Sequence, residues 1–136
     1  MRWNRRAWLT LAMASALVSV CVGAFAAHGG SDRQASELLR TGAQYEFMHA
    51  MACVACAVFM GLGARGAARA PALFLAGTAL FSGSLYAMAL GGPKWIGAAT
   101  PIGGLLFIAG WLILIWSARR IDQLLPAQRK DYEEPP

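Results

Sequence analysis

Charged side chains are scarce in this chain: Asp, Glu, Lys and Arg make up 14% of its 136 residues, whereas soluble domains usually carry about 25%. Four stretches contain none of these residues, namely 7–27, 47–64, 70–92 and 95–118. A helix needs roughly 17–25 apolar residues to cross a bilayer core, and one Lys or Arg at its centre costs about 2.5–3.5 kcal/mol. This pattern excludes a soluble domain and predicts four transmembrane helices.

The chain also lacks the motifs of several enzyme classes. It has no Walker-type loop, no H-E-x-x-H, no G-x-S-x-G and no paired intramembrane carboxylates. We therefore expect a protein that is not an enzyme. Cysteines are few and odd in number, and Cys21, Cys53 and Cys56 all fall in apolar spans, so a secreted disulfide framework is not indicated.

The net charge of +5 comes from basic residues that flank the apolar spans rather than from a stripe with interleaved aromatics. This placement favours the lipid bilayer as partner and gives no support for nucleic-acid binding.

The predicted fold is all-α: an integral membrane four-helix bundle in a single domain, residues 1–118, with a polar cytoplasmic tail at 119–136. The spans are expected at about 8–27, 46–64, 71–90 and 100–118. Between the first two, a short interfacial helix is expected to follow Ser31 or Asp32 as N-cap. Pro71 suits the first turn of the third helix, and Thr100 is predicted as N-cap of the fourth.

The N-terminal span has an alternative interpretation as a signal peptide, because basic residues precede an apolar run that ends in Ala24-Phe25-Ala26. The run is about 20 residues long, against the usual 7–15 of a signal peptide. We expect an uncleaved membrane anchor.

The basic residues predict the orientation. Nine of them fall on one side of the expected spans, at the N-terminus, in the connection 65–69 and in the tail, whereas only Arg33, Arg40 and Lys94 fall on the other. Since Lys- and Arg-rich segments stay cytoplasmic, we predict a multi-pass protein of the cell inner membrane with both termini in the cytoplasm.

Small residues predict where helices pack closely. Ala79, Gly83 and Ala87 form a stripe at steps of four on the third helix. Gly23 is expected to pack on the first helix, and Gly103 and Gly104 on the fourth. The spacing leaves open whether these contacts lie within one chain or between chains.

The topology brings most of the notable polar side chains to one depth near the outer leaflet, a candidate site made of His28, Gln44, Tyr45, His49, Ser82, Ser84, Tyr86 and Thr100. Hydroxyls deeper in the spans, such as Ser15 and Ser19, are expected to bond back to their own helix. His49 is the one ionisable residue predicted inside a span. It is either a structural histidine, bonded to a backbone carbonyl or Tyr86, or part of a proton-handling or ligand site.

A stripe of possible metal ligands runs along the second helix at helical spacing, from Tyr45 through His49, Cys53 and Cys56 to Met60. Its C-x-x-C is single and mid-helix, away from a helix N-terminus, where thiolates are favoured. A haem or quinone between His28 and His49 is a further alternative, without the C-x-x-C-H attachment signature. We expect neither a metal nor another cofactor; His49, Cys53 and Cys56 are the residues to consider for a metal.

Three blocks of the sequence resemble the YgdD/YwdK-like family of small inner-membrane proteins of unknown function, which has eukaryotic relatives. They are Gly23-Ala24-Phe25-Ala26-Ala27-His28-Gly29, similar to the family's G-A-F-G-A-H-G; Gln44-Tyr45 with His49-Ala50; and Leu80-Phe81-Ser82-Gly83-Ser84-Leu85-Tyr86, continued by Thr100-Pro101-Ile102-Gly103-Gly104 and Gly110-Trp111. The resemblance spans residues 23–111. It implies a four-helix membrane protein and no established activity.

Three hypotheses for the function follow. The first is a non-enzymatic binding protein that serves as accessory or assembly partner of a larger membrane system, or forms a homo-oligomer. The second is an oligomeric small-solute or proton-coupled transporter with its polar site at the outer leaflet. The third is a haem- or metal-binding redox protein.

Overall fold

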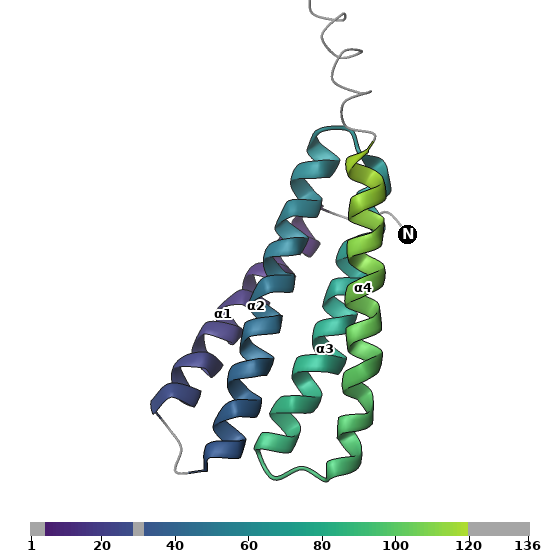
Figure 1. The fold of residues 1–136 in the computed structure, drawn as a ribbon. Coiled ribbons are helices and arrows are strands. Elements are labelled where there is room, and N and C mark those ends of the chain that lie inside the picture. The colour runs from purple at the N-terminus through teal and green to yellow at the C-terminus, as the bar shows by residue number, and fades with distance from the viewer. Residues whose placement is uncertain (1–4, 29–31, 120–136) are drawn as a thin grey trace, which may run out of the picture.

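The structure, a computed structural model, describes residues 5–28 and 32–119 of the chain, which form four long helices joined by short connections (Figure 1). The helices are α1 (Arg5–His28), α2 (Arg33–Gly61), α3 (Ala70–Ala89) and α4 (Ala99–Ala118); the 3₁₀ helices η1 (Arg65–Arg69) and η2 (Lys94–Ala98) precede α3 and α4. All four long helices are long and apolar enough to cross a membrane. The predicted all-α four-helix membrane fold is confirmed. The predicted cap Ser31 and the tail from residue 120 on lie outside the described residues.

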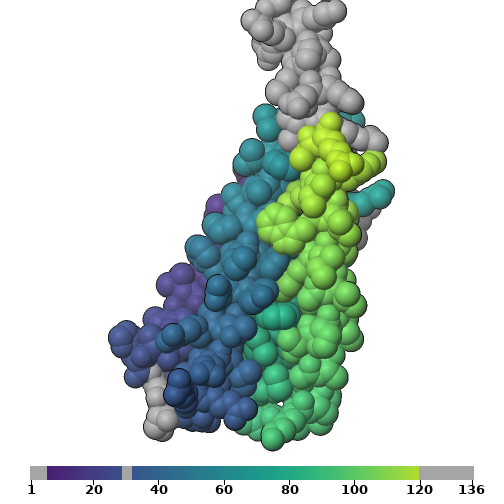
Figure 2. Space-filling model, viewed as in Figure 1, coloured from purple at the N-terminus to yellow at the C-terminus, as the bar shows by residue number. Residues whose placement is uncertain are grey.

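The four helices run up and down in chain order, so the start of α1 and the end of α4 lie at the same end of the bundle (Figure 1). The main contacts are between successive helices: α1 packs on α2, α2 on α3, and α3 on α4. From the side shown in Figure 2, α4 covers most of α3, part of which is visible between α2 and α4. The core therefore lies mainly among α2, α3 and α4, with α1 added on the outside of α2.

In place of the short interfacial helix that we expected, residues 33–45 form the first turns of α2. Asp32 is the N-cap, as predicted, and its carboxylate accepts a hydrogen bond from the Gln34 amide at 2.9 Å. No proline interrupts the segment, and its single glycine, Gly42, is tolerated inside a helix. Because the buried Leu39 and Ala43 hold these turns in the bundle, the helix continues straight into the membrane span.

α2 and α3 end in the same way, with a glycine in the left-handed backbone region. Gly63 has φ +90° and Gly91 has φ +89°. After α2 the amide of Gly63 donates to the carbonyl of Met60, and the amide of Ala64 to that of Phe59 at 3.0 Å. This is the Schellman pattern of a helix C-terminus, and the tight connections it allows keep α2, α3 and α4 adjacent.

The close contact of α3 with α4 rests on glycines that face phenylalanines. A Cβ at Gly77 would lie 2.7 Å from the Phe107 ring, and one at Gly110 would lie 2.5 Å from the Phe74 ring. A Cβ at Gly103 would lie 2.5 Å from the backbone nitrogen of Phe81. These three glycines let the two helices approach to backbone contact.

The other small residues selected from the sequence lie elsewhere. A Cβ at Gly83 or Gly104 would meet nothing within 4 Å, and Ala79 is exposed. Ala87 is half-buried. Gly23 faces α2, where a Cβ would meet that of Ala43 at 3.8 Å. Within the described chain, the small-residue stripe of α3 therefore does not make the close α3–α4 contact.

Thr100 is not the N-cap of the fourth helix. α4 begins one residue earlier, at Ala99, directly after η2, and its N-cap is Ala98. Because η2 already turns the chain into a helical path, no side-chain cap is needed there. The Thr100 hydroxyl instead forms a hydrogen bond with Ser84 of α3.

Candidate functional site

The most unusual feature of the bundle is a carboxyl group buried among three helices. Glu46 of α2 is only 6% exposed. Its Oε1 accepts a hydrogen bond from the Ser15 hydroxyl of α1 at 2.7 Å, and its Oε2 accepts one from the Tyr86 hydroxyl of α3 at 2.6 Å. We call Glu46, Ser15 and Tyr86 the carboxyl site. Its three members come from α1, α2 and α3, so the carboxyl site joins these three helices.

Tyr86 reaches Glu46 because Gly42 has no side chain in its path. A Cβ at Gly42 would lie 2.5 Å from the Tyr86 ring, so only a glycine lets that ring lie across α2 one turn before Glu46. The carbonyl of Gly42 also accepts a hydrogen bond from the Ser82 hydroxyl at 2.8 Å, which holds α2 and α3 together at this level. Since side chains tilt toward the N-terminus of their helix, those of Glu46 and Tyr86, on antiparallel helices, lean toward each other.

The carboxyl site lies inside the apolar part of the bundle. From Arg40, the last charged residue before Glu46, to Gly61 at its end, α2 rises about 31 Å at 1.5 Å per residue. This length matches the bilayer hydrocarbon core of about 30 Å. With Arg40 at the level of the lipid headgroups, Glu46 of α2 lies about 9 Å deeper. Glu46 therefore joins His49 as an ionisable side chain buried within α2, a helix long and apolar enough to cross a membrane.

His49 forms a separate site with both ring nitrogens engaged. Nδ1 lies 2.7 Å from the carbonyl oxygen of Tyr45, and Nε2 accepts the indole N–H of Trp111 at 3.3 Å. A carbonyl can only accept, so Nδ1 carries the hydrogen and Nε2 is the acceptor, as in a neutral imidazole. The ring also stacks on Phe107, with centroids 3.5 Å apart. This arrangement agrees with a structural histidine, bonded to a backbone carbonyl and to Trp111 rather than to Tyr86.

Two further candidate residues bond to each other: the hydroxyls of Ser84 on α3 and Thr100 on α4 lie 2.6 Å apart. The structure thus distributes the predicted outer-leaflet site over separate small contacts. Tyr86 joins the carboxyl site and Ser82 bonds Gly42, whereas Tyr45 lies half-exposed against Phe81. The side chains of His28 and Gln44 are exposed on the surface of the bundle.

The two cysteines of the stripe of possible metal ligands lie in the core. Cys53 and Cys56 are buried free thiols in the apolar cluster with Phe74, and within residues 5–28 and 32–119 no three His, Cys, Asp or Glu side chains are grouped to hold a metal. A haem held by His28 and His49 does not fit either, because His49 already uses both nitrogens and His28 is exposed at the end of α1. That the protein needs no cofactor stays a prediction.

Sequence reasoning missed three residues: Glu46, which stands at the first position of the expected second span and was not counted as ionisable within it; Ser15, which was expected to bond its own helix; and Trp111. Ser19 does bond its own helix, at the carbonyl of Ala16. Helical spacing contains a signal for Glu46, because it follows Gly42 by four residues and precedes His49 by three. Gly42, Glu46 and His49 all lie on the buried face of α2.

Comparison with known proteins places this chain in a family. The family described as "Protein of unknown function (DUF423)" matches residues 22–104, which contain Glu46, His49 and Tyr86 but neither Ser15 nor Trp111. The chain belongs to the DUF423 family. The resemblance noted from the sequence motifs is thereby confirmed.

Relatives of this DUF423 protein carry names that give a location and no activity. A "UPF0382 membrane protein" of Haemophilus influenzae is 38% identical over 120 residues, which cover 86% of this chain and 97% of the relative. The "UPF0382 inner membrane protein YgdD" of Escherichia coli is 38% identical over 122 residues, covering 87% and 93%. The "UPF0382 membrane protein YwdK" of Bacillus subtilis is 34% identical over 120 residues, covering 83% and 96%.

No solved structure matches the chain. The relatives' names and the four apolar helices together identify this DUF423 protein as a membrane protein. The names indicate no enzymatic or transport activity, so the arguments for a function rest on the carboxyl site.

Proposed function

We propose that this chain is the protomer of an oligomeric, non-enzymatic transporter that couples movement of a small solute to protons, with Glu46 binding the coupled proton. The observation that carries the proposal is the burial of this carboxyl among three helices, about 9 Å below the level of Arg40 on α2. Ionisable groups inside a membrane are costly and mark ion pathways and proton relays. An oligomer is proposed because four helices are few for an alternating-access unit.

The hydrogen bonds of Glu46 couple proton binding to helix packing. With both carboxyl oxygens accepting, the Ser15 and Tyr86 hydroxyls each donate one hydrogen. A proton added at Oε1 turns that oxygen from an acceptor into a donor toward Ser15, whose hydroxyl then rotates to a carbonyl of its own helix. Because α1 packs mainly on α2, this exchange reverses the direction of the hydrogen bond between α1 and α2 at the level of the site.

The same proposal includes the orientation: an inner-membrane protein with both termini in the cytoplasm. Among the described residues, Arg5, Arg6, Arg65, Arg69 and Arg119 lie at the end of the bundle where α1 begins and α4 ends, against Arg33, Arg40 and Lys94 at the other, and the positively charged end is the cytoplasmic one. A cysteine in place of the exposed Trp95, in a chain without its own cysteines, should react with a membrane-impermeant maleimide added to intact cells. If the cysteine is labelled only after cell lysis, both termini lie on the opposite side of the membrane and the proposed orientation is wrong.

A second candidate is the accessory or assembly role. The open positions Gly83 and Gly104, where a Cβ would meet no described residue within 4 Å, support it, because small residues allow a partner helix to approach closely.

One experiment separates the two candidates. Proteoliposomes with a pH-sensitive dye inside receive, one at a time, small amines, amino acids and monocarboxylates. For at least one solute we expect a change in internal pH with the natural protein and with Glu37→Gln, a change at an exposed carboxylate. Glu46→Gln, which keeps the side-chain volume, should reduce it to the level of empty liposomes. If no solute moves protons with the natural protein, the transport proposal fails and the assembly role is favoured.

A further inference from the structure

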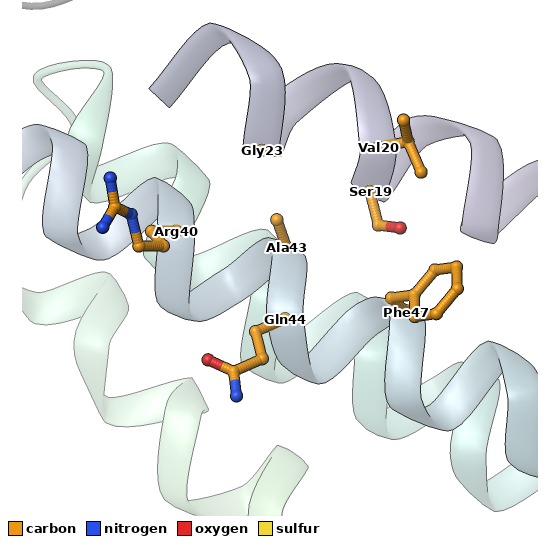
Figure 3. A pocket seen from close by; sticks show the side chains of 7 residues that line it. All are labelled: Ser19, Val20, Gly23, Arg40, Ala43, Gln44 and Phe47. Carbon is orange, nitrogen blue, oxygen red and sulfur yellow. The ribbon is translucent and has the colours of Figure 1, made fainter. Parts of the chain in front are cut away.

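A groove lies between α1 and α2 (Figure 3). Its volume is about 320 Å³, and it is lined by Ser19, Val20 and Gly23 of α1 and by Arg40, Ala43 and Phe47 of α2. Gln44, which also borders it, points away from α1 in Figure 3. Gly23 lies over Ala43, and a Cβ added there would approach that of Ala43 to 3.8 Å. Between Arg40 and Phe47 of α2, it extends about 10 Å along the helix.

The walls of the groove face the membrane. Val20 is 59% exposed and Phe47 is 44% exposed, and both belong to spans that cross the bilayer. In this region the surrounding solvent is lipid acyl chain, so apolar walls favour a chain in the groove rather than water or a polar peptide.

Arg40 gives the groove a charged end. Its side chain is exposed, and within residues 5–28 and 32–119 no acidic group lies at ion-pair distance from it. The nearest carboxylate along the helix, Glu37, pairs with Arg33 at 3.4 Å. By the length of α2, Arg40 lies at headgroup level, where its planar guanidinium can donate two parallel hydrogen bonds to a phosphate.

We propose that this groove is a binding site for an anionic phospholipid, with one acyl chain along the groove and the phosphate bonded to Arg40. An anionic headgroup is favoured over a zwitterionic one because the latter brings its own ammonium group next to Arg40 and competes for the phosphate. The site is independent of the carboxyl site, since it requires no titration or movement of Glu46.

The test is retention of phosphatidylglycerol by detergent-purified protein, measured by native mass spectrometry against phosphatidylcholine and inorganic phosphate. We expect phosphatidylglycerol to bind at least tenfold more tightly than phosphatidylcholine, and inorganic phosphate not to bind. Arg40→Gln should weaken phosphatidylglycerol binding about tenfold. The matched control Arg33→Gln removes a guanidinium two turns away on the same helix and should change binding less than twofold.

A second variant tests the groove without changing charge. Val20→Trp fills the groove from an exposed position and should weaken phosphatidylglycerol binding while leaving the protein folded. Equal binding of both lipids, equal effects of the two arginine variants, or unchanged binding in Val20→Trp would each overturn the proposal. Binding of inorganic phosphate as tight as that of the lipid would instead assign Arg40 to a free anion.

Discussion

Replacing Gly103 by Ala should destabilise the protein by about 3 kcal/mol, the upper end of the usual cost of overpacking. The added Cβ would lie 2.5 Å from the backbone nitrogen of Phe81 and 2.8 Å from the carbonyl oxygen of Gly77. Both atoms belong to the α3 backbone and cannot rotate away as a side chain can, so α3 and α4 must move apart. That movement also weakens the contacts of Phe107 with Gly77 and of Phe74 with Gly110.

Gly104 is the matched control, because it is the next residue on α4 and a Cβ there meets nothing within 4 Å. Gly104→Ala should leave stability unchanged or raise it by up to about 1 kcal/mol, the helix-propensity advantage of alanine. Unfolding can be followed by labelling of the buried thiols Cys53 and Cys56 in a Cys21→Ser background, since Cys21 is exposed. Equal stability of the two alanine variants would refute the close α3–α4 contact.

Replacing Glu46 and Tyr86 together should cost less than the sum of the two single replacements. Glu46→Leu leaves the Tyr86 hydroxyl without its acceptor, and Tyr86→Phe leaves Oε2 of Glu46 without its donor. An unsatisfied buried polar group costs about 1–3 kcal/mol, and more when it is charged. With both replaced, no member of this bond remains unpaired, and apolar replacement of a buried polar pair is often neutral or stabilising.

The measurement is a double-mutant cycle of unfolding free energies, in which the double variant should be more stable than the sum of the singles predicts by at least about 1 kcal/mol. Ser84→Ala serves as control, because its bond to Thr100 shares no member with the carboxyl site. Combined with Glu46→Leu it should be additive within about 0.5 kcal/mol. Additivity of Glu46→Leu with Tyr86→Phe would show that their hydrogen bond does not contribute in the membrane.

Several features could be predicted from local sequence because their causes are local. A run without charges identifies a span through the cost of inserting each residue, Asp32 supplies its own capping oxygen, and Pro71 starts α3 where its missing N–H is not needed. The resemblance to the DUF423 family likewise followed from short motifs.

Glu46 could not be recognised by the same reasoning. A count of charges treats its carboxyl as a cost and places the span boundary at this residue, whereas in the folded protein Ser15 and Tyr86 provide its partners. These residues lie 31 and 40 positions away in sequence. Without the tertiary contacts, nothing indicates that the cost is offset.

The glycines that pack closely could not be identified from the sequence either, because their role also depends on tertiary contacts. Spacing identifies Gly83 and Gly77 equally well as small residues of α3, but only the rotation of the helix decides which one faces a neighbour. Phe107 and Phe74 set that rotation, because each ring requires a glycine opposite it. The sequence by itself therefore determined the four spans and their order, since membrane insertion depends on the composition of each segment. Only the tertiary structure decided which polar groups meet inside the bundle, because their stability depends on partners from other helices.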